Sequence, residues 1–77
     1  MTLESFLLHE TSEGELCAIT SHGYIEQTAY IDHEDLFIHG IKNTKKHVES
    51  WHFGTLVVYS DEGRRTPVPV RYIEIGD

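Results

Sequence analysis

The residues of this chain best suited to chemistry are carboxylates, and they are concentrated near its beginning. The first 35 residues hold eight carboxylates and no lysine or arginine, and the first basic residue is Lys42. From residue 36 onward five acids stand against six basic residues, so the net charge of −7 arises in the first part. The eight are Glu4, Glu10, Glu13, Glu15, Glu26, Asp32, Glu34 and Asp35. A surface of one sign attracts oppositely charged partners over long range.

Six of these acids flank two turn signals, at residues 11–14 and 32–35. In an up-and-down sheet alternate turns fall at the same end, so these six side chains are expected to cluster there. They are Glu10, Glu13, Glu15, Asp32, Glu34 and Asp35. The cluster predicts a docking face for a basic protein surface. The alternative is that these are solvated turn residues that serve solubility.

Catalytic arrangements are sparse in this sequence. Ser5, His9 and Glu10 form one nominal nucleophile–base–carboxylate set, but a chain rich in histidine offers such sets readily. The nucleophile elbow, the P-loop and the dinucleotide-binding fingerprint are all absent from the sequence. The adjacent carboxylates Glu34 and Asp35 are expected in a turn open to water, where a pKa is hard to tune. We therefore expect no enzymatic activity and no cofactor.

Histidine is unusually frequent for a chain of 77 residues. The six are His9, His22, His33, His39, His47 and His52. None belongs to a spacing that places metal ligands together in advance, such as HExxH. The densest group, residues 33–35 with His39, is expected to straddle a turn and a strand. We expect no metal site, although pairing across strands leaves this question open.

Length and composition indicate one small folded domain spanning residues 1–77. Hydrophobic residues make up 39% of the chain, which is enough for a core. A chain this short buries a smaller fraction of its surface than a longer chain does, so its stability is expected to be marginal. The single cysteine, Cys17, lies in an apolar run and excludes an internal disulfide framework. No apolar stretch approaches the length of a membrane span. The sequence therefore predicts a soluble protein of the reducing cytoplasm.

The elements that must position these residues are expected to be strands. Short apolar or alternating runs separated by turn signals predict six of them. They are residues 5–10, 15–20, 24–31, 36–41, 51–60 and 64–75. Residues 42–50 are polar and predict a loop or one short helical turn, with Thr44 as its cap. Pro67 and Pro69 lack N–H donors, so the last strand is expected at an edge or with its proline side unpaired.

This pattern favours an all-β fold, namely a small antiparallel meander, barrel or strongly bent sheet of five to six strands. A small barrel of the OB or SH3-like kind would allow direct nucleic-acid binding as an alternative function. The aromatic residues suit base stacking. Six basic residues among thirteen acids disfavour a groove that follows phosphates. A further alternative is a homo-oligomeric regulatory subunit, in which an unpaired edge strand pairs with its copy.

These observations predict a small acidic protein-binding module that acts as an inhibitor or adaptor. Its partner is expected to be a basic protein surface, such as that of a nucleic-acid-binding protein. Phage-encoded blockers of nucleic-acid machinery, including anti-CRISPR-like proteins, are the same physical type of object: short, acidic and without an active site. We expect neither direct nucleic-acid binding nor membrane association.

Overall fold

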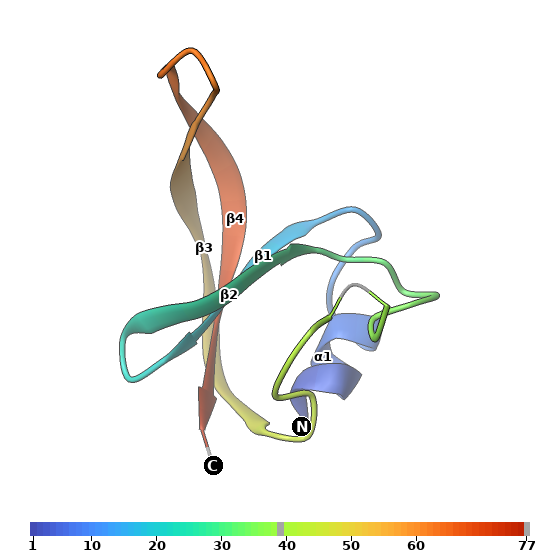
Figure 1. Ribbon diagram of the computed structural model, residues 1–77. Helices are drawn as coiled ribbons and strands as arrows, with labels where there is room; N and C mark the ends of the chain where they lie inside the picture. The colour runs from blue at the N-terminus through green and yellow to red at the C-terminus, as the bar shows by residue number, and fades with distance from the viewer. Residues whose placement is uncertain (39, 77) are drawn as a thin grey trace.

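The computed structural model describes residues 1–38 and 40–76 as one helix followed by four strands (Figure 1). The helix α1 spans Leu3–His9, and the strands are β1 (Leu16–Ser21), β2 (Tyr24–Tyr30), β3 (His47–Tyr59) and β4 (Arg65–Gly76). The expectation of a chain made mostly of strands is confirmed. The expectation of five to six strands is wrong, because two of the expected strands form other structures.

The four strands form one open sheet in the order β2-β1-β4-β3. Two antiparallel hairpins, β1–β2 and β3–β4, are joined through a parallel pairing of β1 with β4. An antiparallel meander or a closed barrel is therefore wrong for this chain. Both hairpins follow from local turn signals. The first turn consists of His22 and Gly23, which both have positive φ, as a two-residue hairpin turn requires.

The expected strand at residues 5–10 is instead helical: residues 5–9 belong to α1, and Glu10 is its C-cap. Leu3, Phe6 and Leu7 are all buried and follow the spacing i, i+3, i+4 of a helical face. The side chain of Thr2 caps the first turn by accepting a hydrogen bond from the N–H of Ser5 at 3.2 Å. A short apolar run does not distinguish a strand from a buried helix by itself, and here packing against the sheet favours the helix.

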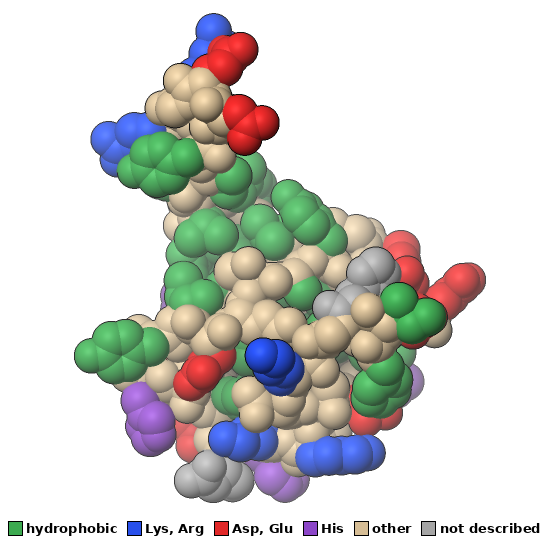
Figure 2. Space-filling view, in the orientation of Figure 1, with side chains coloured by type: hydrophobic (Ala, Val, Ile, Leu, Met, Phe, Trp, Pro, Cys, Tyr) green, Lys and Arg blue, Asp and Glu red, His purple; other side chains and the backbone are tan. Residues whose placement is uncertain are grey.

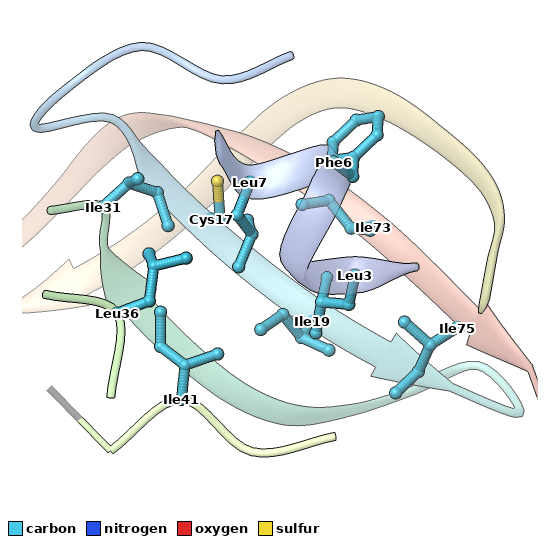
Figure 3. Packing of buried hydrophobic residues seen from close by; sticks show 10 residues of the cluster. All are labelled: Leu3, Phe6, Leu7, Cys17, Ile19, Ile31, Leu36, Ile41, Ile73 and Ile75. Atoms are coloured by element: carbon cyan, nitrogen blue, oxygen red, sulfur yellow. The ribbon is translucent and has the colours of Figure 1, made fainter. Parts of the chain in front are cut away.

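One face of the sheet carries the main core (Figure 3). α1 packs against Cys17 and Ile19 of β1 and against Ile73 and Ile75 of β4. The segment after β2 completes the cluster with three buried side chains, Ile31, Leu36 and Ile41. The core is therefore built from α1, β1, β4 and the segment after β2, with Ala29 of β2 and Val48 of β3 packed against it.

The expected strand at residues 36–41 is a series of turns in the described structure. The carboxylate of Asp35 accepts a hydrogen bond from the N–H of Ile38 at 3.0 Å, and the N–H of Ile41 donates to the carbonyl of Leu36. Leu36 and Ile41 are buried while Phe37 and Ile38 are exposed, so two inward side chains produced a strand-like apolar pattern. His39 lies outside the described residues.

Residues 42–50 are not helical. The N–H of Lys46 donates to the carbonyl of Asn43, which closes a turn, and β3 begins at His47. Thr44 caps no helix. Its carbonyl instead accepts the N–H of Glu4 at 3.0 Å and ties this loop to the first turn of α1.

The outer halves of β3 and β4 form a two-stranded ribbon that projects from the rest of the molecule (Figure 1). β1 pairs only with residues 71–74 of β4, whereas β3 pairs with β4 along nearly its whole length. Pro67 and Pro69 thus lie where β4 has β3 on one side and no strand on the other, as their missing donors require. No described helix has the length and apolar character needed to cross a membrane.

Candidate functional site

Residues 11–14 and 32–35, which we call the first and second acidic loops, lie side by side at one end of the β1–β2 hairpin. The N–H of Gly14 donates to the carbonyl of Ile31 at 2.7 Å, and the N–H of Ile31 donates to the carbonyl of Glu15 at 2.9 Å. A side-chain contact adds to this pair, because Glu13 accepts the N–H of His33 at 2.8 Å. The loops flank a hairpin, so their proximity does not depend on the order of the remaining strands.

Two of the acids shape their own loop, and a third, Glu13, contacts the other loop. Asp32 accepts the N–H of Glu34 at 2.9 Å, and Asp35 accepts the N–H of Ile38 at 3.0 Å. Glu13 lies 3.4 Å from Nδ1 of His33 as well as accepting that residue's N–H. Each of these bonds to a backbone N–H orders a loop without cancelling the negative charge of the carboxylate.

Glu15 differs from the exposed acids Glu10 and Glu34 because it is partly buried and Arg71 neutralises it. Nε of Arg71 lies 2.7 Å from Oε1 of Glu15, and a second guanidinium nitrogen donates to Oε2 at 3.3 Å. A third nitrogen of the same guanidinium donates to the carbonyl of Glu10 at 2.8 Å. Arg71 is 9% exposed, so this pair holds the first acidic loop against β4 and is not available to a partner.

The five remaining carboxylates form what we call the acidic surface. They are Glu10, Glu13, Asp32, Glu34 and Asp35. In the space-filling view acidic side chains gather on the flank where these loops lie (Figure 2). The acidic surface can attract and pair with arginine and lysine side chains. Its most accessible members are Glu10, Glu13 and Glu34, which are exposed.

Arg71 also lies among aromatic rings at the junction of α1 and β3. Its guanidinium carbon is 4.5 Å from the ring centre of Phe53 and 4.7 Å from that of Trp51. Trp51 in turn contacts Phe53 edge-on at 5.3 Å and Phe6 at 6.0 Å. Phe6 is buried, whereas Trp51 is 45% and Phe53 65% exposed. The cation thus supports two large side chains at the surface of β3.

The basic residues do not combine into a single patch. Lys42, Lys45 and Lys46 belong to the loop before β3, while Arg64 and Arg65 lie at the tip of the ribbon. In the space-filling view blue side chains occur at the ribbon tip and, separately, along the opposite end of the molecule (Figure 2). Arg71, the remaining basic residue, is committed to Glu15. This separation counts against direct nucleic-acid binding.

Metal ligation has no support among the residues that the structure describes. They contain no group of three or more His, Cys, Asp or Glu side chains able to hold a metal ion. Nε2 of His33 is buried and lacks a hydrogen-bond partner, although its Nδ1 faces Glu13. His39, the other member of the expected group, lies outside the described residues.

Sequence reasoning missed the row of exposed apolar side chains on the ribbon. On one face Tyr59 is 65% and Val57 41% exposed, and the row continues to Phe53 and Trp51; Val58, also 41% exposed, lies on the opposite face. Hydrophobic side chains along the ribbon are visible in the space-filling view (Figure 2). The available signal was the stretch 50–59, which contains no Asp, Glu, Lys, Arg or Pro. This signal does not distinguish a core strand from an exposed one, because alternation alone does not show whether anything covers a strand.

Comparison with known proteins leaves the site to be interpreted from its own geometry. No protein-family model, characterised protein or solved structure matches the chain.

Proposed function

We propose that this protein is a small protein-binding module, an inhibitor or adaptor, whose acidic surface occupies a basic surface of its partner. The observation that carries the proposal is the pair of backbone hydrogen bonds joining the two acidic loops through Gly14, Glu15 and Ile31. These bonds hold the two acidic loops together, and the exposed carboxylates of Glu10, Glu13 and Glu34 lie on or beside them, while Glu15 pairs with Arg71. A cluster of like charges maintained in this way favours binding to a positively charged protein.

The mechanism would have two stages. The summed negative charge first raises the rate of encounter with a basic partner. This rate enhancement falls as salt is added, because the screening length is already about 10 Å at 0.1 M salt. Exposed carboxylates, chiefly Glu10 and Glu34, then pair with arginine or lysine side chains, with arginine allowing two parallel hydrogen bonds. Nucleic-acid-binding proteins present such arginine-rich and lysine-rich surfaces. A blocker of this kind would compete with nucleic acid for the same surface.

The test uses charge reversal at positions that make no structural hydrogen bond through the side chain. Glu10→Lys with Glu34→Lys reverses two exposed acids of the acidic surface. Glu26→Lys with Glu62→Lys reverses two exposed acids elsewhere and changes the net charge equally, so it serves as the matched control. Tagged wild type and both variants are used to capture proteins from nuclease-treated bacterial lysate at low and high salt.

The expected result is one basic protein that wild type and the control retain at low salt and release at high salt. The Glu10→Lys, Glu34→Lys variant should lose it while keeping the wild-type circular dichroism spectrum. If that variant retains the same protein as wild type, the acidic surface is not the binding site. Material that is retained only when nuclease is omitted would instead support nucleic-acid binding.

A further inference from the structure

A second surface, which contains none of the acidic-surface carboxylates, is the outer edge of β3. β3 is the last strand in the order β2-β1-β4-β3, so only one of its two edges pairs within the sheet. The N-terminal residues cover the start of the outer edge, where Thr2 forms a bridge with His47 and the N–H of Val48 donates to the carbonyl of Met1. From residue 49 to Tyr59 no described strand lies against this edge.

The prolines of β4 show which backbone groups face outward. Val57 pairs with Pro67 and Thr55 with Pro69, and a residue without an N–H cannot exchange two hydrogen bonds with its partner. Both are therefore non-hydrogen-bonded pairs of the antiparallel ladder. In such pairs the N–H and C=O groups of Thr55 and Val57 point away from β4. With a period of two, the same holds for Phe53. The hydroxyl of Tyr72 crosses the strand and donates to the carbonyl of Thr55 at 3.0 Å, in keeping with this direction.

The two edges of the ribbon are protected unequally. Along β4, Pro67 and Pro69 remove donors from the open side and prevent another strand from pairing there. Along β3, residues 50–59 contain no Pro and no charged side chain of Asp, Glu, Lys or Arg. A long apolar edge of this kind is a template for pairing with another chain. The ribbon itself has only two strands, and two strands alone are marginally stable in water.

We propose that the outer edge of β3 pairs antiparallel with β3 of a second copy, joining two sheets into one continuous sheet. An isologous pairing of this kind closes on itself and gives a dimer. The exposed parts of Trp51, Phe53 and Tyr59 can contribute at most about 350 Å², taking roughly 200 Å² for a whole aromatic side chain. That is nearly half of the about 800 Å² that each partner buries in a standard interface, before Val57, Val58 and the backbone are added.

Two constraints select the register of the pairing between the two copies of β3: like charges must not lie opposite each other, and the part of the edge that Thr2 occupies is not open. A two-fold axis at Gly54 uses the open edge 49–59 symmetrically and sets Phe53 opposite Thr55 and Trp51 opposite Val57. Placing the axis at Thr55 instead sets Glu49 opposite Asp61, two like charges. Placing it at Phe53 brings Tyr59 opposite His47, where Thr2 already occupies the edge.

The first measurement is sedimentation equilibrium of wild type over a wide concentration range, combined with amide hydrogen exchange by NMR. Pairing predicts an alternating pattern along β3. The outward amides of Phe53, Thr55 and Val57 should gain protection as concentration rises, whereas those of Gly54 and Leu56, which face β4, should be protected at every concentration. Dimerisation through any other surface does not produce this alternation.

Two variants test the edge directly. Val57→Pro removes one outward donor without touching the bonds to β4, because its partner there is Pro67. Thr55→Lys places a charge on the same edge, and Thr66→Lys, at an exposed position of β4, is the matched control. Either edge variant should raise the dimer dissociation constant by at least about tenfold, whereas the control should leave it near the wild-type value.

A wild-type protein that sediments as one chain at every concentration overturns the proposal. So does a dimer whose Phe53, Thr55 and Val57 amides stay unprotected, or one that Thr55→Lys does not weaken. Should Val57→Pro fail to fold, Thr55→Lys still decides the matter. Because neither variant alters the acidic surface, loss of the dimer and loss of partner capture are separate outcomes.

Discussion

The guanidinium of Arg71 and the carboxylate of Glu15 form a nearly buried ion pair, with Nε of Arg71 2.7 Å from Oε1 of Glu15. The two side chains are 11% and 17% exposed. Their pairing connects β4 to the first acidic loop, and the same guanidinium lies under Trp51 and Phe53. One contact thus removes a carboxylate from the acidic surface and supports the aromatic side chains of β3.

Breaking this pair on one side should be costly. Arg71→Met leaves the carboxylate of Glu15 little exposed and unpaired, so we expect the free energy of unfolding to fall by about 3 kcal/mol. Lys45→Met removes the partner of Glu4 in an ion pair whose lysine is 86% exposed, and should cost less than about 1 kcal/mol. Urea unfolding of both variants makes the comparison. The double variant Arg71→Met, Glu15→Leu should be more stable than Arg71→Met alone, and equal losses in the two single variants would refute this account.

Gly54 is required by the ring that covers it. A Cβ at this position would meet Cε2 of Tyr72 at 2.7 Å, and that ring stacks on His52 with centres 5.1 Å apart. We expect Gly54→Ala to destabilise the protein by about 1–3 kcal/mol, because the ring must move. In thermal unfolding, the same substitution made in a Tyr72→Ala background should cost much less. Equal costs in the two backgrounds would show that the ring is not the reason.

The thiol of Cys17 should make stability fall in alkali. Burial, with a smaller contribution from the charge of Glu15, raises the pKa of Cys17 from 9.0 to about 12. The unfolded chain therefore releases this proton between pH 9 and about 12 while the folded protein keeps it. Its contribution is fully present below pH 9 and is lost by about 1.4 kcal/mol per pH unit above it.

Urea unfolding at about pH 8 and about pH 10.5 measures this loss, with Cys17→Ala as the reference because lysine and tyrosine titration affect both proteins alike. The wild type should lose more stability than Cys17→Ala between the two conditions. Equal losses would mean that the thiol ionises as easily in the folded protein as in the unfolded chain.

The side-chain cap of α1 should contribute measurably to the free energy of unfolding, although the helix is short. Thr2→Ala removes the acceptor of the Ser5 N–H, and we expect a loss of about 1 kcal/mol in the free energy of unfolding. Thr44→Ala is the control, since Thr44 contacts α1 through its backbone carbonyl and not its side chain. Both variants are compared by chemical denaturation. A cost for Thr44→Ala as large as that for Thr2→Ala would count against side-chain capping.

The turn signals predicted the two hairpins well, because a hairpin is specified by a few neighbouring residues. The gaps between the expected strands 15–20 and 24–31 and between 51–60 and 64–75 coincide with the two hairpin turns, and the flanking strands agree to within a few residues. The apolar runs at 5–10 and 36–41 were misassigned for a shared reason. A few inward side chains in a helix turn or a loop have the same composition as a short strand, and only the surface they pack against distinguishes them.

By itself, the sequence determined the excess of acid in the first part of the chain, the two hairpins and the unpaired proline side of β4. These properties depend on composition or on residues close together in the chain. Only the tertiary structure decided three other features: the parallel pairing of β1 with β4, the docking of α1 and the ion pair between Arg71 and Glu15. Each brings a segment near the start of the chain against β4, more than fifty residues away. Such contacts form because together they bury one continuous core, and no local signal specifies which distant segments will share it.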